Sequence, residues 1–455
     1  MCRLLKGAFA IAGLFVSLGQ SQELLDEVNF RAGELGGLHL VGISAFGGYS
    51  TSAYPQAGIN LSAAPGLGNL GGDESYGATA SLGWQWNREK ANVSVLYSGT
   101  YAGMVRYSNL NSYNQSLSIS AVRTLTPKWT VSLTASGTDN SLAQYLFQPS
   151  AVSVLTQIPS TFDDLAAAVS IGQFSNAQVA SMLTGAPVLQ LPGRSTLAGD
   201  RILSYAAQVS LGYALSSRLQ LHFGTFAAAG QNRLGGQQES TLPANYIMPR
   251  SIGVNGGIGF TYSLSPRTEV GAEVEGNRTV NRYQSAYITS AMGSFGRKMG
   301  VHWFLRAQGG GSYSDFTQQS IGTPKARQIV GGGSLGFQTH SQTLVASYNR
   351  TASDSFGFAV GTVTAASGAW NWRRAGSRWG LSASFSQQQT RNAGFASLSG
   401  WQASGGITDT LNPHTTLSAQ YVYLNDAGDY AGVFNTFSVQ SIRLSVGWAP
   451  QPVQR

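Results

Sequence analysis

The sequence predicts an all-β chain whose strands close into a single transmembrane antiparallel β-barrel. Three observations lead to this prediction: long segments of alternating apolar and polar residues, connections that are short at one end of the strands and long at the other, and aromatic residues sorted by strand end. The composition agrees, because only 11% of residues are charged, against about 25% in soluble proteins. With 42% hydrophobic residues and a mean hydropathy of -0.06, the chain is neither a typical soluble globule nor a helical membrane protein, and the alternation mixes apolar and polar residues finely.

Alternation recurs in segments of about ten to fifteen residues from residue 37 onward. In residues 76–86 every second side chain from Tyr76 to Trp86 is apolar, and the side chains between them are small or polar. Residues 203–213 and 442–448 repeat this pattern. Successive side chains of a strand point to opposite faces, so each segment has one apolar and one polar face. Such strands are longer than the five or six residues usual in soluble proteins, and about nine to eleven tilted residues cross a bilayer.

The connections between these segments alternate in length. The short ones lie near residues 87–90, 126–128, 216–218, 265–267, 296–298, 340–342, 373–378 and 410–414. Several have a Leu-Ser-Pro-Arg-like sequence, in which Pro presets the backbone at the second turn position. Short turns on one side and long loops on the other are typical of outer-membrane barrels, where the short turns are periplasmic. Counting the segments gives about 18 strands, with 16 as the alternative because the patterns near residues 43 and 289 are weak.

The tryptophans gather near the short turns. Eight of the nine do so, Trp401 being the exception: Trp84, Trp86, Trp129, Trp303, Trp370, Trp372, Trp379 and Trp448. Many tyrosines lie toward the long loops instead. Trp and Tyr favour the boundary between lipid and water, so this sorting predicts aromatic girdles at the two interfaces.

The N-terminus predicts export. Arg3 and Lys6 precede a short apolar core, and small residues follow it, as in a cleaved signal peptide over residues 1–22. We expect a periplasmic N-terminal segment over 23–36, the barrel over 37–448 and a periplasmic tail over 449–455. Cys2 is the only cysteine, so the mature chain has no disulfide. Its formal charge becomes 8 − 2 = +6, which is compatible with a mild anion preference of the interior.

These strand patterns, the Leu-Ser-Pro-Arg-like turns and the aromatic last strand ending at Trp448 make the chain resemble large porin-type outer-membrane β-barrel proteins, including barrel porins linked to exopolysaccharide export. The resemblance covers residues 37–448. It implies a channel for small polar solutes or for polysaccharide export, with outer-membrane lipids, the assembly machinery and periplasmic chaperones as partners. Barrels of this kind often end on the aromatic residue, whereas here Ala449 to Arg455 follow. A structural or partner-binding barrel without an open pore is the alternative, and a barrel enzyme is a less favoured one.

Charged residues on the polar faces are the candidate pore-lining groups. They are Glu269, Glu273, Glu275, His302, Arg306, Arg123 and Arg443. In a water-filled interior such groups set ion preference, while in the simpler interpretation each is a solvated or self-paired wall charge. The three glutamates share one face of one predicted strand, so they predict an acidic stripe.

The long connection over residues 137–200 carries two helix signals. Asp163 and Asp164 suit a helix N-terminus, and Ser175 with Gln178 fits a capping box. The simpler interpretation is an external cap that packs on its own apolar residues. The functional interpretation is a segment that folds into the barrel and narrows the pore or binds a ligand, because loops this long without a function are uncommon. The sequence leaves both interpretations open.

No catalytic, metal or cofactor site is predicted. The five histidines are scattered over different strands, without the clustering that metal ligation needs or a recognisable catalytic set. No run of Lys and Arg points to nucleic acid as a partner.

Overall fold

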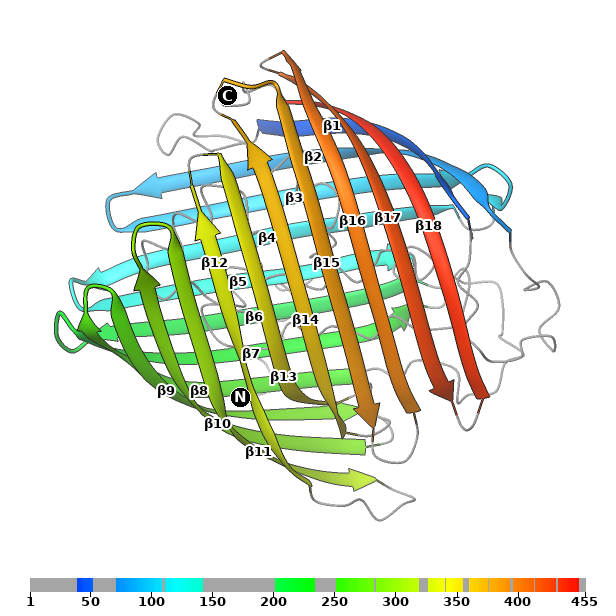
Figure 1. Cartoon of the computed structure of the whole chain (residues 1–455). Helices are drawn as coiled ribbons and strands as arrows, with labels where there is room; N and C mark the ends of the chain where they lie inside the picture. The colour runs from blue at the N-terminus through cyan, green and yellow to red at the C-terminus, as the bar shows by residue number, and fades with distance from the viewer. Residues whose placement is uncertain are drawn as a thin grey trace.

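Eighteen antiparallel strands form one sheet that closes on itself in the computed structural model of the chain (Figure 1). The structure describes residues 39–51, 71–108, 111–141, 201–233, 251–281, 284–318, 326–339, 341–354, 360–374, 376–392, 396–412, 414–430 and 433–449. Closure is direct, because β1 pairs with β18 on one side and with β2 on the other. The predicted 18-stranded all-β barrel is therefore confirmed.

The strands in chain order are β1 (His39–Ser50), β2 (Asp73–Arg88), β3 (Ala91–Met104), β4 (Ser112–Thr126), β5 (Trp129–Ser141), β6 (Arg201–Ala214), β7 (Leu219–Arg233), β8 (Ser251–Ser265), β9 (Thr268–Asn281), β10 (Gln284–Met299), β11 (Trp303–Gln318), β12 (Ala326–Gln338), β13 (Gln342–Asp354), β14 (Val360–Arg373), β15 (Trp379–Asn392), β16 (Ala396–Asn412), β17 (Thr415–Tyr430) and β18 (Val433–Trp448). They are 12 to 17 residues long. Among the residues that the structure describes, no helix is both long and apolar enough to cross a membrane.

Alternation along each strand separates an outward apolar face from an inward polar face. On β18 the side chains of Ile442, Leu444 and Val446 are about half exposed, whereas Ser445 between them points inward and hydrogen bonds to Ser418 of β17. Hydrocarbon offers no hydrogen bonds, so a sheet in lipid has to pair its strand edges. Closure of β1 onto β18 does this for the first and last strands.

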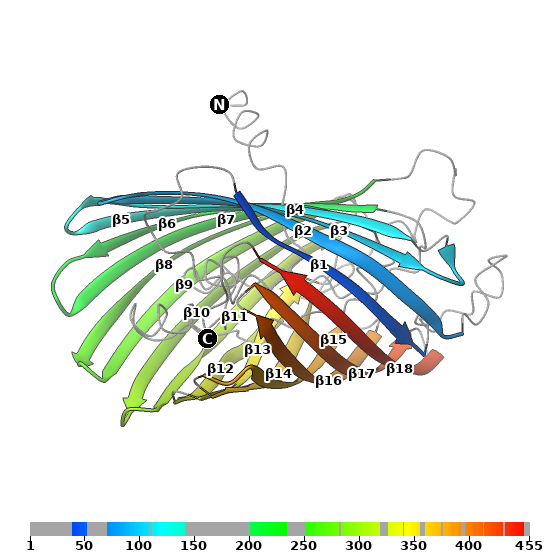
Figure 2. The ribbon, with the colours of Figure 1, turned by 90° about the horizontal axis from the view of Figure 1, so that it is seen from above.

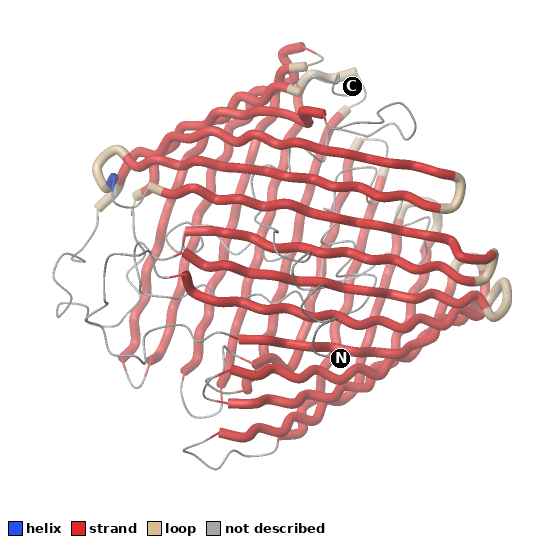
Figure 3. Tube along the Cα trace, turned by 180° about the vertical axis from the view of Figure 1, so that it is seen from behind, coloured by secondary structure: helices blue, strands red, loops and turns tan. Residues whose placement is uncertain are grey.

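The barrel is flattened, so that two walls of the sheet face each other. The strands β2 to β9 form one wall and β13 to β18 form the other, and the strands of the two walls cross at a large angle (Figures 1 and 3). The view from above shows β1 and β18 lying side by side where the two walls meet (Figure 2). The strands β10 to β12 join the walls at the opposite side.

One short turn lies further along the chain than predicted. The sequence placed it at residues 296–298, but β10 continues to Met299, and Arg297 still pairs with Leu305 of β11. The turn is made by residues 300–302, where Gly300 has a φ of 69°. Such a backbone conformation favours Gly, which has no Cβ to clash. The charges of Arg297 and Lys298 therefore belong to the end of a strand and not to a turn.

The last strand ends where the sequence placed it. Trp448 of β18 pairs with Ile43 of β1, and the next residue is held in place as well. The Ala449 N–H donates to the carbonyl of His414 at 2.9 Å, and Nδ1 of His414 lies 3.0 Å from the carbonyl oxygen of Ala449. Strand β5 extends to Ser141, so the long connection begins later than the predicted residue 137. Residues 1–22, 23–36, 142–200 and 450–455 lie outside the described residues.

Candidate pore lining

Three glutamates form a row on the inward face of β9. Glu269, Glu273 and Glu275 alternate with outward residues such as Val274, whose side chain is 50% exposed. This arrangement matches the acidic stripe expected from the sequence. The stripe lies on the last strand of the first wall, next to β10.

Arg306 of β11 lies on the same inward face, two strands away from the acidic row. Arg306 and Glu269 are both opposite Gly296 of β10, one from each side. Gly296 has no side chain, so β10 places no side chain between the Arg306 guanidinium and the Glu269 carboxylate at this position. Arg306 is attracted electrostatically by Glu269 and by Glu273. The register of three strands therefore brings together charges that are far apart in sequence.

Glu275 is held by hydrogen bonds from both neighbouring strands. The Ser290 hydroxyl of β10 donates to one carboxylate oxygen at 2.7 Å, and the Asn255 amide of β8 donates to the other at 3.4 Å. Asn255 and Ser290 are themselves buried. Hydrogen bonds to a carboxylate are stronger than those between neutral groups, so they fix the direction of this side chain.

His222 of β7 belongs to the same cluster and was not predicted from the sequence. It pairs with Gly259 of β8, which in turn pairs with Glu273 of β9. The imidazole lies over Gly259, because a Cβ built there would collide with Nε2 of His222. His222 also lies close enough to Arg306 to interact with it electrostatically. We call His222, Glu269, Glu273, Glu275 and Arg306 the charged wall.

Arg443 of β18 also points inward, as predicted, but far from the charged wall in strand order. Its guanidinium lies over the ring of Phe46 of β1, 3.6 Å from the ring centre. Arg443 pairs with Gly48 of β1, so this contact spans the seam between the first and last strands. A cation over an aromatic face is stabilised by the ring quadrupole.

Much of the remaining inward face is lined by hydroxyl groups. Pairs of serines on neighbouring strands hydrogen bond to each other, including Ser347–Ser367 at 2.7 Å, Ser384–Ser404 at 2.6 Å, Ser418–Ser445 at 2.6 Å and Ser81–Ser98 at 3.1 Å. Ser132 and Ser210 form another such pair. The interior thus combines a charged patch on β7 to β11 with an uncharged polar surface on other strands.

Two predicted lining residues lie elsewhere. Arg123 of β4 is on the outward face. It is an even number of residues from the exposed, outward Tyr113, and the register with β3 is unbroken between them. Its position next to the short turn lets the guanidinium reach water at the end of the strand. His302 lies in the turn before β11, where Nδ1 is 2.8 Å from the carbonyl oxygen of Gln338. Neither Arg123 nor His302 therefore lies on the inward face of a strand.

The eight tryptophans near the short turns all lie on outward faces. Trp129 stacks on Tyr213 of β6, with ring centres 4.3 Å apart, and Trp303 packs against Phe337 of β12 at 4.7 Å. Trp86, Trp303, Trp379 and Trp448 are more than one third exposed. This is the arrangement expected of an interfacial girdle.

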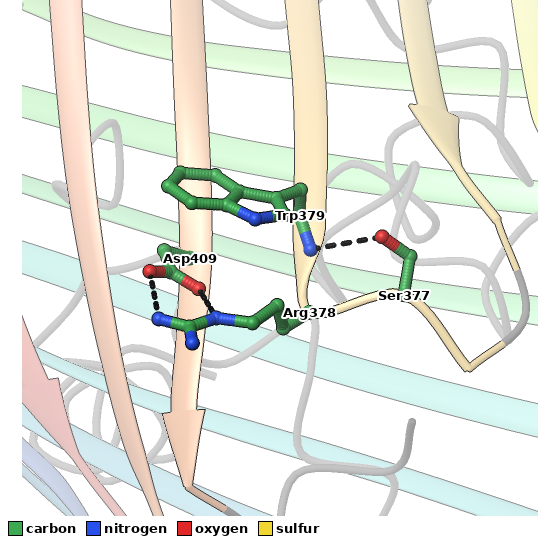
Figure 4. Close-up of polar contacts among 4 residues, drawn as sticks. All are labelled: Ser377, Arg378, Trp379 and Asp409. Atoms are coloured by element: carbon green, nitrogen blue, oxygen red, sulfur yellow. Dashed lines mark hydrogen bonds and ion pairs between the residues drawn. The ribbon is translucent and has the colours of Figure 1, made fainter.

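A bidentate ion pair fixes the turn before β15. Nε and one terminal nitrogen of the Arg378 guanidinium donate to the two carboxylate oxygens of Asp409 at 2.6 and 2.5 Å, as Figure 4 shows. The Trp379 N–H donates to the Ser377 hydroxyl at 3.1 Å. The hydrogen bonds to Asp409 raise the pKa of the Arg378 guanidinium. The two parallel hydrogen bonds from the planar guanidinium fix the relative orientation of the two side chains, and they connect this turn to β16.

Several predictions fall on other parts of the chain. Asp163, Asp164, Ser175 and Gln178 lie outside the described residues, so the choice between cap and constriction stays a prediction. Within the described ranges no group of three or more His, Cys, Asp or Glu side chains is arranged to hold a metal ion.

The barrel shape has counterparts among solved structures. OccK2 (OpdF) of Pseudomonas aeruginosa in complex with glucuronate aligns with a TM-score of 0.42 at 11% identity, over 90% of this chain and 98% of that one. A BenF-like porin from Pseudomonas fluorescens Pf-5 aligns at 0.41 and 10%, over 90% and 98%. The FrpB iron transporter from Neisseria meningitidis aligns at 0.42 and 8%, over 94% and 82%. No family model and no curated protein matches the chain.

Proposed function

We propose that this protein is a channel of the bacterial outer membrane that passes small polar solutes through the interior of the barrel. The observation that carries the proposal is the closed sheet with an apolar outward face and a polar inward face that includes the charged wall. An apolar exterior with aromatic residues near one end suits lipid, and a polar interior suits water. Barrels of 16 to 18 strands are wide enough to leave an aqueous channel.

The charged wall supports a preference for cations near β9. Glu269, Glu273 and Glu275 supply three carboxylates, while Arg306 supplies one guanidinium. Charges on a pore wall act on passing ions at close range and set their preference. The basic net charge of the whole chain therefore does not describe this part of the interior.

Export of a polysaccharide is the second candidate. It is favoured by the serine pairs on the inward face, because hydroxyl groups exchange hydrogen bonds with sugars without attracting either sign of charge. The length dependence of permeation separates the two candidates, since a channel for small solutes excludes long oligosaccharides.

Liposome swelling tests the proposed function. Refolded protein is inserted into liposomes, and swelling is followed in solutions of neutral sugars of increasing size. The proposal predicts swelling whose rate falls as the sugar becomes larger, relative to liposomes without protein. Protein that is folded, as shown by its heat-modifiable gel shift, and still gives no swelling would refute the open channel.

The same assay tests whether the long connection after β5 constricts the interior of the barrel or caps it. If it constricts the interior, deleting residues 150–190 raises the swelling rate or extends it to larger sugars. If it is an external cap, the same deletion leaves the size limit unchanged while the barrel still folds.

A further inference from the structure

The pairing between β12 and β13 stops before either strand ends. It runs from the short turn as far as the pair Gly331–Arg350. Beyond that pair, β12 stays paired with β11 and β13 stays paired with β14, in both cases to the end of the strand. Residues 326–330 of β12 and 351–354 of β13 are therefore neighbours in the strand order that do not pair with each other.

The end of β13 has turned into the barrel. Ala352 packs against Ala286 and Ile288 of β10, both of which are buried. These two residues face inward, because they are separated by even numbers of residues from Ser290, which reaches the inward Glu275 stripe, and β10 pairs regularly with both neighbours. Ala352 belongs to the same face of β13 as Tyr348, which is exposed and outward. The outward face of β13 thus comes to lie against the inward face of β10.

This turn leaves β12 with an open edge. Ile329 is 78% exposed, since its neighbour on β11 is Gly311, which has no side chain, and the pairing with β13 has already ended. The backbone groups of a strand edge need hydrogen-bonding partners, above all in lipid. One side of β12 therefore lacks the partner that a closed barrel normally supplies.

Within the described part of the chain, the buried polar atoms without a hydrogen bond lie on β11, β12 and β13. They are Oε1 of Gln328, Oδ1 of Asn349 and the hydroxyl oxygens of Ser312 and Ser334. Gln328 lies directly opposite Ser312 on the inward face. Buried polar groups in proteins are normally paired, so this part of the barrel has hydrogen-bonding capacity that its present arrangement does not use.

The unpaired ends have residues that suit each other in a continued register. Past Gly331–Arg350 the next four pairs would be Val330–Thr351, Ile329–Ala352, Gln328–Ser353 and Arg327–Asp354. On the outward face, this register places an apolar residue beside Ile329 and an acidic residue beside Arg327. On the inward face, it places a hydroxyl-bearing residue opposite Gln328. Apolar, hydrogen-bonding and oppositely charged cross-strand pairs each stabilise a sheet.

We propose that the long-loop end of β13 is a gate with two positions. In the turned-in position, which the structure shows, it packs against Ala286 and Ile288 and narrows the interior. In the paired position it continues the ladder with residues 326–330 of β12, lies in the wall and widens the interior. The end of β14 moves with it, because β13 and β14 stay paired to their ends. The narrowing rests on the proposed channel function, whereas the two positions of β13 do not.

β12 is the fixed edge in this movement. A Cβ built on Gly331 would lie 2.6 Å from the carbonyl oxygen of Gln308 and 2.9 Å from Cα of Gly309. Only glycine permits this close approach, which holds β12 against β11. Each position of β13 gives up contacts that the other makes, apolar packing on β10 or strand pairing with β12, and such a segment can switch between two arrangements.

Two engineered disulfides test the two positions. The chain without residues 1–22 has no cysteine, so the two introduced thiols can pair only with each other within the barrel. I288C/A352C joins β13 to β10 in the turned-in position. I329C/A352C joins β13 to β12 in the paired position, where the two residues are directly opposite. Disulfide formation is measured as the loss of free thiol on oxidation of the refolded barrel.

The control is L335C/A346C, because Leu335 and Ala346 are already opposite each other on β12 and β13. We expect all three variants to form their disulfide. Single-channel conductance is then compared before and after reduction with dithiothreitol. Reduction should raise the conductance of I288C/A352C, lower that of I329C/A352C and leave the conductance of the control unchanged.

Failure of either test pair to form a disulfide, under conditions that oxidise the control, would overturn the proposal, because β13 would then not occupy that position. Equal conductance of the two oxidised test variants would overturn it as well. Folded protein that forms both disulfides and carries no current in any variant refutes the open channel, while the crosslinks still support the two positions of β13.

Discussion

Replacing both Glu273 and Glu275 with Gln removes two of the three carboxylates of the charged wall. Glu269 and Arg306 then remain, one formal charge of each sign, so the formal net charge of these four groups changes from −2 to zero. Gln has nearly the shape of Glu, and its amide keeps an oxygen that accepts hydrogen bonds from Ser290 and Asn255. The double variant therefore changes charge with little change in packing.

The size of the effect follows from the number of charges removed. In water, a carboxylate changes the energy of a monovalent ion about 10 Å away by about 0.4 kcal/mol, and by about 0.15 kcal/mol after screening in 0.1 M salt. Two carboxylates together favour a cation over an anion by about 0.6 kcal/mol, because the sign reverses for the anion. Their loss should lower the cation-to-anion permeability ratio about threefold.

The assay is the reversal potential across a planar bilayer under a salt gradient. The reduction should be present near 0.1 M salt and absent near 1 M, where the screening length falls to about 3 Å. E74Q is the control, because Glu74 lies on the outward face of β2 opposite Tyr49, and its loss leaves the charged wall unchanged. An unchanged reversal potential at 0.1 M in the double variant, or an equal shift in E74Q, would show that ions do not pass this wall.

Three further substitutions or truncations test the structure around the pore. D73A removes the carboxylate that accepts the backbone N–H groups of Glu74, Arg106 and Tyr107 at 2.8 to 3.0 Å, and we expect a loss of about 2 kcal/mol in urea unfolding; stability equal to wild type contradicts this. G259A forces the His222 side chain to move and should destabilise the barrel by about 1 to 3 kcal/mol. G309A is the control, because an added Cβ there meets open space, and it should cost less stability. A larger loss in G309A than in G259A would contradict the placement of the imidazole. Removing residues 448–455 should impair assembly measured by the heat-modifiable gel shift, while removing 450–455 should not; normal assembly of the longer truncation would show that β18 does not end at Trp448.

The strand count could be predicted because the period-two pattern is set by backbone geometry alone. Segments as short as 442–448 show which side chains share a face, and the structure keeps that alternation in β18. The turn after β10 was placed too early because Arg297 and Lys298, although charged, belong to the end of β10. Strands of this barrel are longer than the bilayer needs, so charged residues occur within their ends.

The charged wall could be predicted only in part. The row of glutamates follows from alternation within one strand, but their approach to Arg306 depends on the register of β9, β10 and β11 around Gly296. Register between strands is not visible in the spacing of residues along a chain. His222 was missed for the same reason, since a single histidine between two apolar residues gives no signal of its own. Arg123 was assigned to the polar face because it is charged. It is separated from Leu117 and Ile119 by even numbers of residues, so it lies on the same outward face as they do.

Single-channel recording in a planar bilayer tests the central claim most directly. Refolded protein, checked by its gel shift, is added to the bilayer and current is recorded at fixed voltage. An open channel predicts discrete conductance steps, with a preference for cations that declines as salt is raised. Persistent silence from folded protein would contradict the account, and would leave a barrel that serves as a structural or partner-binding element of the membrane.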